Sequence, residues 1–370
     1  MGFWLYKTFQ SQKSFDGDSG TEVFDLPKRG IISNIMLESY ALSGTQKVSI
    51  MSQDIFSKIE IIGNGSTVIQ SLTGTQVQAS QAHDDGRLSQ DKEMVPSGGC
   101  YGYFDIRFGR FVGDPKYALD CGRWDAVELK VTYDLAAGGT KGTTGYTTAT
   151  GKLKAYGLYS PEGDGVSPVG YLKKELKKTH TTTAGGTEDL ALPTDFPYRR
   201  ILLCHKTNYY PMNDPFQYVT LDINNGARKP LDNLSGADLM QFERMLEKQV
   251  MYHQVVEMYL SGADYLFPRL GFVISGAYFS EDTTLVGGDI GVGNVHVHAG
   301  GAGTGYVHAY GFHPDRTLSI DLEKWSGGKD GVEAMMDCLG YDQSADIHLQ
   351  HTQQHADSTS HIVLEQYASK

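Results

Sequence analysis

The sequence predicts an all-β protein made of two β-sandwich domains. The chain has 370 residues, more than one domain of ordinary size, and 40% of them are hydrophobic, enough for a sizeable buried core. Most segments alternate apolar and polar residues, the period that places successive side chains on opposite faces of a strand. Helical stretches do not alternate with these strands, so the pattern favours sandwiches over an α/β fold.

Strands are expected along most of the chain. Residues 127–133 and 103–108 alternate most regularly, and each run should bury one of its faces against a core. The other expected strands lie at 30–37, 59–72, 152–159, 200–205, 219–223, 270–274, 318–322, 347–350 and 362–367.

Two Asn-Gly pairs mark tight hairpins at similar places in the two halves. Asn64 and Gly65 interrupt one apolar run, and Asn225 and Gly226 interrupt another. Both residue types accept a positive φ, which tight hairpin turns require. This similarity between the two halves suggests an internal duplication, because a repeated architecture gives similar sequence signals at similar positions.

One helix is expected, beginning after Ser235. Ser235 and Asp238 have the spacing of a capping box, in which the two residues satisfy each other's backbone N–H groups. Good helix formers continue to about Leu260. An apolar stripe along this run should pack on a sheet or on a neighbouring subunit; it consists of Leu239, Phe242, Leu246, Val250 and Tyr252 or Val256.

Changes in composition divide the chain into four parts. Residues 1–20 are expected to form an N-terminal arm, 21–160 the first sandwich, 161–196 a linker and 197–370 the second sandwich. Pro and Gly punctuate the linker, as they do in connecting segments. The second sandwich carries a Gly-rich insertion at about 282–315, which should be a surface loop outside either core.

Composition also disfavours several functional classes. The formal charge of -12 argues against a broad nucleic-acid-binding face, which needs clustered Lys and Arg. No apolar run reaches the roughly 20 residues of a membrane helix, and the first residues do not have the pattern of a signal peptide. The chain is therefore expected to be made and kept inside a cell. No CxxC spacing occurs among the cysteines, which are expected to be buried thiols; they are Cys100, Cys121, Cys204 and Cys338.

Four histidines are the strongest candidates for metal ligands. His296 and His298 are two residues apart, hence on one face of a strand, as in cupin-type sites. His308 and His313 would supply further ligands. A cupin site also needs a carboxylate, and no acidic residue lies between 289 and 315. The sequence therefore does not predict a metal site here, although these four residues are the ones to inspect.

Neither catalytic residues nor a bound cofactor is expected. The sequence has no nucleophile elbow, phosphate-binding loop or metalloprotease motif. A structural divalent cation stays open, because three acidic pairs offer hard oxygen ligands; they are Asp16 with Asp18, Asp84 with Asp85, and Glu281 with Asp282.

Seven segments, taken in their order along the chain, resemble a known family. They are 26–31, the hairpin at 59–72, 124–135, 152–159, 189–203, the helix from Ser235 and the final strand at 361–367. In this order the chain resembles the double jelly-roll major capsid proteins of internal-membrane icosahedral viruses, most closely the corticovirus type of coat protein. The Gly-rich insertions at 140–151 and 282–315 depart from that pattern.

The resemblance implies two tandem jelly-roll sandwiches, with a short helix in the second and Gly-rich loop insertions. It implies a structural protein and not an enzyme: a major capsid protein forming pseudo-hexagonal homotrimers that tile an icosahedral shell over an internal membrane. Its partners would be neighbouring trimers, vertex (penton) and minor capsid proteins and the internal lipid membrane, without direct nucleic-acid binding. It would assemble in the host cytoplasm and reside in the virion capsid.

The first residues mix aromatic and basic side chains, a composition suited to lipid headgroups or to a neighbouring subunit. These contact residues are Phe3, Trp4, Tyr6, Lys7 and Phe9. Two other functions stay open for the whole chain: a bicupin-like metal enzyme and a secreted carbohydrate-binding module. The missing carboxylate ligand weighs against the first, and the missing signal-peptide pattern against the second.

Overall fold

Four β-sheets make up most of the described chain. In many strands buried residues alternate with more accessible ones, as in β9 (Val127–Asp134), where every second residue is half-buried, because one face lies against a core. The structure is a computed structural model; it describes residues 3–44, 51–92, 98–136, 145–206, 215–246, 251–266, 269–280, 288–291, 294–325, 346–356 and 358–369.

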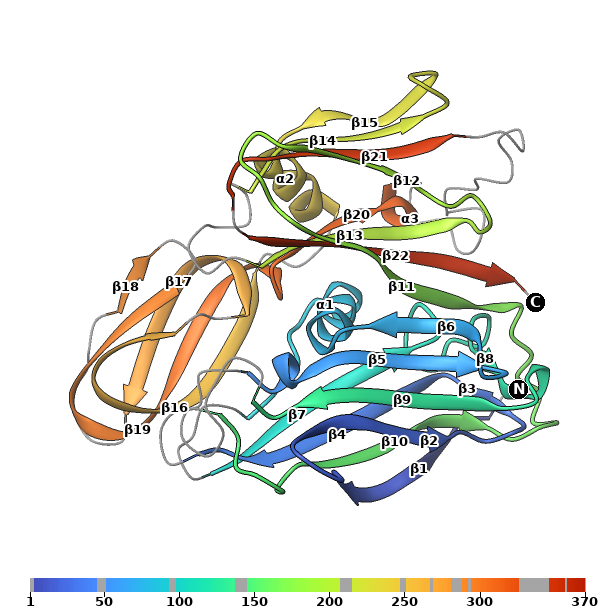
Figure 1. Cartoon of the computed structure of the whole chain (residues 1–370), viewed down its shortest axis with the longest axis horizontal. Helices are drawn as coiled ribbons and strands as arrows, with labels where there is room; N and C mark the ends of the chain where they lie inside the picture. Colours follow the sequence, from blue (N-terminus) through green and yellow to red (C-terminus); the bar gives the residue numbers. More distant parts are fainter. Residues whose placement is uncertain are drawn as a thin grey trace.

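The first sandwich consists of two sheets packed face to face (Figure 1). One sheet has the order β7-β4-β10, continued by β3 and β8, and β1 pairs with the other side of β10. The facing strands have the order β2-β9-β5-β6. The bounds are β1 (Leu5–Ser14), β2 (Ser19–Asp25), β3 (Ile31–Ile32), β4 (Asn34–Leu42), β5 (Phe56–Gly63), β6 (Thr67–Leu72), β7 (Gly99–Arg107), β8 (Leu119–Asp120) and β10 (Lys152–Ser160).

The second sandwich packs strands in the order β11-β22-β13-β20 against the sheet β12-β21-β14-β15. β11 pairs in parallel with β6, so one eight-stranded sheet runs through both sandwiches. The bounds are β11 (Gly170–Thr181), β12 (Thr187–Ala191), β13 (Tyr198–Lys206), β14 (Phe216–Ile223), β15 (Arg228–Leu234), β20 (Thr317–Asp321), β21 (Ile347–Gln353) and β22 (Thr359–Ser369).

The two sandwiches repeat one strand order. The strands β2-β9-β5-β6 correspond to β12-β21-β14-β15, and β1-β10-β4-β7 correspond to β11-β22-β13-β20. The Asn-Gly hairpins expected from the sequence are β5–β6 and β14–β15, and Asn64, Gly65, Asn225 and Gly226 all have positive φ. A helix follows each hairpin: α1 (Gly74–Asp85) in the first sandwich and α2 (Gly236–Leu246) in the second.

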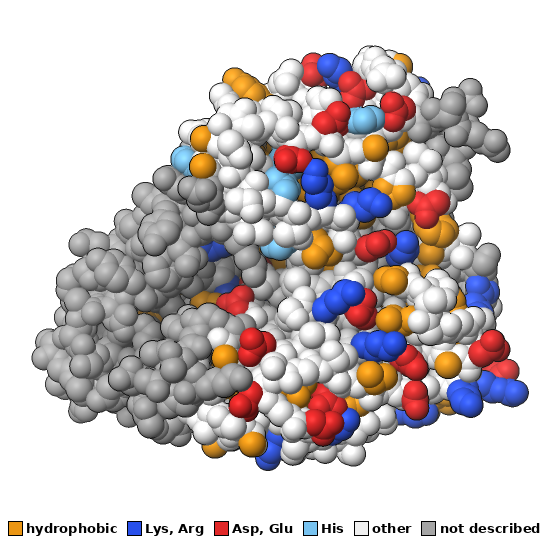
Figure 2. Space-filling view, in the orientation of Figure 1, with side chains coloured by type: hydrophobic (Ala, Val, Ile, Leu, Met, Phe, Trp, Pro, Cys, Tyr) orange, Lys and Arg blue, Asp and Glu red, His pale blue; other side chains and the backbone are white. Residues whose placement is uncertain are grey.

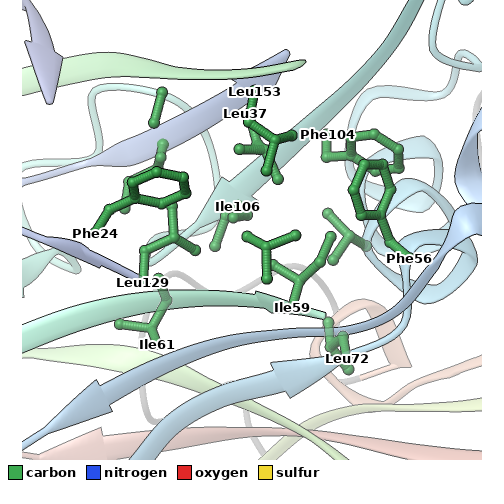
Figure 3. Packing of buried hydrophobic residues seen from close by; sticks show 14 of the residues in the cluster. Phe24, Leu37, Phe56, Ile59, Ile61, Leu72, Phe104, Ile106, Leu129 and Leu153 are labelled. Carbon is green, nitrogen blue, oxygen red and sulfur yellow. The ribbon is translucent and has the colours of Figure 1, made fainter. Parts of the chain in front are cut away.

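Each sandwich has its own apolar core. In the first, Phe104 of β7 packs edge-on against Phe56 of β5, with ring centroids 5.0 Å apart (Figure 3). Leu202 and Val363 come from strands of the second sandwich but pack into this core, so the first core continues across the joint. The core of the second sandwich surrounds Leu349 of β21.

Two segments differ from the sequence-based expectation near the N-terminus and between the sandwiches. Residues 5–14, expected within an N-terminal arm, form β1 and pair with β10. The expected linker at 161–196 contains β11 and β12, two strands of the second sandwich. Both segments look polar and irregular locally, but pairing with a distant strand supplies their backbone hydrogen bonds.

The fourth sheet contains two segments that were predicted otherwise: the end of the helix expected to reach Leu260, and the insertion at about 282–315 expected to be a loop. Its order is β16-β19-β17, with β18 also paired to β19, and it projects from one end of the sandwiches (Figure 1). The helix expected to reach Leu260 is wrong from Tyr252 onward, because residues 252–256 alternate buried and exposed as a strand does; Val250 of the predicted stripe lies outside the described residues. The insertion at about 282–315 is not a loop in its described part, since its glycines lie in paired strands. The bounds are β16 (Tyr252–Leu266), β17 (Leu270–Ser280), β18 (Gly288–Gly291) and β19 (Asn294–Pro314).

The sequence analysis did not predict α1, although a local signal for it exists. Thr73 and Gln76 form a capping box at its start, and Gly86 ends it with a φ of 68°. The remaining short helix is α3 (Leu322–Trp325). Within the described ranges no helix has the length and apolar character that crossing a bilayer requires.

Candidate functional site

The four candidate histidines all belong to β19, and the two whose side chains the structure describes, His308 and His313, have different partners. His308 is half-buried, and its Nδ1 lies in a hydrogen bond with Nε2 of His253 on the neighbouring β16, at 3.0 Å. The side chains of His296 and His298 lie outside the described residues. In the described part of the chain, no group of three or more His, Cys, Asp or Glu side chains is arranged to hold a metal ion.

His313 lies in a different place, at a junction of three parts of the molecule. Its Nδ1 is 3.0 Å from Oε2 of Glu243 on α2, and Nδ1 of His83 on α1 is 3.0 Å from the other carboxylate oxygen. Thr317 donates its hydroxyl hydrogen to the Pro314 carbonyl and therefore accepts from Nε2 of His83, at 2.9 Å. A buried carboxylate thus ties together both sandwiches and the fourth sheet.

The acidic pairs do not form open cation sites in the described structure. Asp84 and Asp85 face arginine side chains, so their oxygens are already neutralised. Asp18 accepts a hydrogen bond from the backbone N–H of Ala149 at 3.1 Å. Glu281 and Asp282 lie outside the described residues.

A buried network of charges forms the centre of the joint between the sandwiches. Arg200 of β13 is fully buried, and its Nη2 donates to Glu365 of β22 and to Asp84 of α1, each at 2.9 Å. Lys174 of β11 donates to Ser80 Oγ at 2.7 Å, and this hydroxyl in turn donates to Glu365. The network therefore connects α1 with three strands of the other sandwich.

Electrostatics decide the protonation of this network. Burial alone would raise the pKa of Glu365, but Arg200 and Lys174 outweigh it and lower that pKa to about 2. The pKa of Asp84 is likewise held well below its usual range, with burial opposed by Arg199 and Arg200. Both carboxylates are ionised at neutral pH, and such a set of charges serves to hold two bodies in register.

The fourth sheet is attached by a second buried pair. Arg269 makes a two-pronged contact with Asp315, at 2.7 and 2.9 Å, and donates to Asp91 of the first sandwich at 2.8 Å. Gln53 adds a hydrogen bond to Asp315 at 2.9 Å. Bidentate arginine–carboxylate contacts fix orientation as well as distance, so the fourth sheet is oriented on the sandwiches.

One end of the second core contains histidines that sequence analysis did not single out. His180 stacks on His351 with ring centroids 5.1 Å apart, and His205 and His351 both pack against Phe216. Burial lowers the pKa of His205 to about 3 and that of His351 to about 4, helped by neighbouring positive or protonatable groups. These imidazoles are neutral at pH 7, and nothing local in the sequence marks them, because they come from three separate strands.

The outer face of the sheet β7-β4-β10-β1 is rich in tyrosine. Four tyrosines lie half-buried side by side on the strands of this face, and Tyr6 on β1 is 86% exposed. A cleft of about 270 Å³ opens on the same face; it is lined by Gln12, Glu38, Tyr40, Tyr101, Lys152, Leu153 and Lys154. The four half-buried tyrosines are Tyr40, Tyr101, Tyr103 and Tyr156. We call this the tyrosine face.

The five N-terminal contact residues are not all available for a partner. Phe9 packs against the first core, Trp4 packs on a small cluster around Ile31, and Lys7 lies over the ring of Tyr159. Phe3 and Tyr6 are exposed, by 59% and 86%. Phe111, Val112 and Val169 are further exposed apolar side chains of this chain.

Charged side chains of both signs are interspersed over the sandwiches on the face shown in Figure 2. No large field of Lys and Arg covers the described atoms of this face. The arrangement on this side resembles an ordinary solvated surface and not a nucleic-acid-binding groove.

Comparison with known proteins identifies the fold. No protein-family model matches the sequence, and no curated protein does. The major capsid protein of Sulfolobus turreted icosahedral virus is 12% identical with a TM-score of 0.61, covering 100% of this chain and 97% of that one. Major capsid protein P2 of bacteriophage PM2 is 14% identical with a TM-score of 0.55, covering 100% and 99%. VP54 of PBCV-1 is 9% identical with a TM-score of 0.58, covering 99% and 94%.

At these identities the likeness establishes the fold alone. It extends over nearly the whole of each chain, so both sandwiches and their relative placement are shared. The chain is a double jelly roll, and the fold class predicted from the sequence is confirmed.

Proposed function

We propose that this chain is a major capsid protein and that its double jelly roll is the building block of an icosahedral shell. A single observation carries the proposal: the likeness to three viral capsid proteins spans almost the full length of every chain compared. A likeness limited to one sandwich would carry little, because single sandwiches serve many unrelated functions. Two sandwiches in one fixed arrangement are far more specific.

The proposed working unit is a homotrimer. Three copies bring six sandwiches of one strand order into a ring, which has a pseudo-hexagonal outline and tiles a shell. A closed ring of this kind also covers sheet edges that a single copy leaves open. The first partners are thus other copies of the chain, followed by neighbouring trimers and by vertex and minor capsid proteins. The site of assembly is the host cytoplasm, and the final location is the virion capsid.

The end of the molecule that carries both termini is the proposed inner end, facing an internal membrane (Figure 1). Phe3 and Tyr6 are exposed there. Aromatic side chains favour the headgroup region, so many copies on one vesicle would bind by multivalency even if each contact is weak.

The proposed function contains no catalytic step. The buried carboxylates of the joint are occupied by arginines, and the histidines with described side chains on β19 point to separate partners. No observation in the described structure therefore favours the metal-enzyme alternative, and none favours the carbohydrate-binding one.

Sedimentation of the purified chain, followed by negative-stain imaging at high concentration, tests this proposal. We expect a stable homotrimer without detergent, hexagonal arrays of trimers, and co-flotation of the trimer with anionic vesicles at low salt. A monomer across a wide concentration range, with no arrays, would overturn the capsid assignment. Trimers that do not float would leave assembly intact and remove only the membrane contact.

A further inference from the structure

We infer that a second copy of this chain docks on the exposed side of α2, and that it presents its tyrosine face there. The inference rests on the proposed function and deepens it by naming the two surfaces that close the ring. Its basis is internal: the joint between the two sandwiches of one chain is a template for the joint between chains.

The template is the packing of α1 against the second sandwich. α1 follows the β5–β6 hairpin and lies between the sandwiches, with nearly all of its residues buried (Figure 1). Ser80 donates to Glu365 of β22 at 2.6 Å, and His83 contacts Thr317 of β20 at 2.9 Å. Beside the helix, β6 pairs in parallel with β11. The first sandwich thus contributes a helix and a strand edge to the joint.

The second sandwich has the same helix in the same place, but in the described structure two side chains on its outer side are exposed. Counted from the capping residues Thr73 and Ser235, Ser80 corresponds to Phe242 and His83 corresponds to Met245. The count also aligns the core residues of the two helices, Val77 and Leu239, both of which are buried.

The two positions that make the joint in α1 are therefore apolar and exposed in α2. Phe242 is 46% exposed and Met245 is 81% exposed. Phe242 and Met245 lie three residues apart on α2 and so share one side of the helix, where covering them would remove apolar surface from water. The strand beside α2 is β15, which is an edge strand in the described sheets. Its counterpart β6 would also be an edge strand, but it pairs with β11 of the other sandwich.

The matching strand orders of the two sandwiches also indicate which surface of the second copy would receive α2. In the internal joint, α1 packs on the side of β11-β22-β13-β20 that is turned away from the second core. The equivalent strands β1-β10-β4-β7 turn the tyrosine face away from the first core. Phenylalanine and methionine pack favourably on aromatic rings, and tyrosines are enriched where proteins bury flat surface.

The positions of the two surfaces make the contact head-to-tail. In Figure 1 β15 lies at the top of the molecule and α2 in its upper half, whereas β1 and β10 lie at the bottom. A head-to-tail contact gives a closed ring when the rotation between copies divides a full turn, and an open filament when it does not. The internal joint is one such step between similar sandwiches, and the homotrimer proposed above requires that the ring close after three chains.

Two double variants of the full chain test this inference by sedimentation. Variant X carries Phe242→Asp and Met245→Asp, and variant Y carries Tyr103→Asp and Tyr156→Asp. Each should weaken self-association by about 100-fold or more and run as a monomer, because buried aromatic and apolar anchors dominate interfaces. Mixing X with Y should give a 1:1 dimer, since the intact tyrosine face of X meets the intact α2 of Y.

A matched control separates a specific contact from a general effect of added charge. Phe111 is 51% exposed, similar to Phe242, but lies on neither surface, so Phe111→Asp should leave the trimer intact. Circular dichroism of X and Y checks that both fold. Trimers that persist in folded X and Y, or a mixture that stays monomeric, would overturn the inference while the wild-type trimer upholds the proposed function. A wild-type monomer would instead overturn the proposed function itself.

Discussion

The two sandwiches share a strand order but close their cores with different chemistry. The first core is apolar and aromatic, with Phe56 and Phe104 at its centre. The second core is apolar over most of its length but ends at His180, His205 and His351. Only one of the twelve histidines, at position 83, precedes residue 160. The same strand order therefore accommodates an apolar core or one that ends in histidines. Because burial lowers the pKa values of these histidines, we expect the second sandwich to be the more sensitive to acid.

Breaking the joint should have the largest effect, because it removes what makes the sandwiches behave as one unit. Arg200→Ala removes one of the two buried arginines that contact both Asp84 and Glu365, and breaking a buried charge pair costs about 3–5 kcal/mol. In calorimetry we expect one unfolding transition for the intact chain and two for the variant, one for each sandwich.

The matched control for this variant is an exposed ion pair. Arg29 and Glu162 are 3.3 Å apart with side chains 77% and 68% exposed, so Arg29→Ala should change stability very little. A loss of less than about 1 kcal/mol in Arg200→Ala would show that the network does not hold the sandwiches together.

Acidification should destabilise the second sandwich more than the first. His205 and His351 bind a proton more readily in the unfolded chain, near 6.5, than in the fold, where their pKa values are about 3 and 4. Stability is therefore complete above about pH 6.5 and is lost as the pH falls, by about 1.4 kcal/mol per pH unit for each histidine. Hydrogen exchange should show β13 and β21 opening before β4 and β9.

Replacing the histidines sharpens this test. The double variant His205→Leu with His351→Leu should reduce the loss of unfolding free energy as the pH falls. Neither leucine can take up a proton when the chain unfolds. Other charged or titratable groups at this end are His180, His355, Lys178, Glu188 and Arg316, and they remain unchanged. Burial also lowers the pKa of His180, so a smaller part of the slope should remain. His348 is the control: Asp189 and Asp346 raise its pKa, so its contribution is lost as the pH rises. An unchanged acid slope in the double variant would place the sensitivity elsewhere.

The smallest effect is expected from removing the N-terminal caps of the two helices, α1 and α2. Thr73 accepts a hydrogen bond from the Gln76 N–H at 3.3 Å, and Ser235 accepts one from the Asp238 N–H at 3.1 Å. Removing such a cap costs about 1 kcal/mol. Thr73→Ala should cost more than Ser235→Ala in urea unfolding, because water reaches the exposed start of α2 more easily. Equal losses would mean that burial of α1 does not matter for its cap.

Local sequence was sufficient for the elements whose signals are local. The hairpins at Asn64 and Asn225 need a positive φ that few residues accept, and the cap at Ser235 needs one short hydroxyl side chain, so composition at a few positions specifies them. Alternation specified strands such as β9 for the same reason. The start of α1 at Thr73 carried an equally local signal that the analysis overlooked.

Only the tertiary structure decided the features that depend on distant pairing. Glycine has a low strand propensity, so the run at 294–314 looks like a loop until β16 and β17 pair with its two sides. Lys174 and Glu365 look like ordinary surface charges in polar strands until the first sandwich covers them. His205 and His351 are 146 positions apart and meet only in the folded core. The period of a sequence fixes which side a residue faces, but the fold alone determines what covers that side.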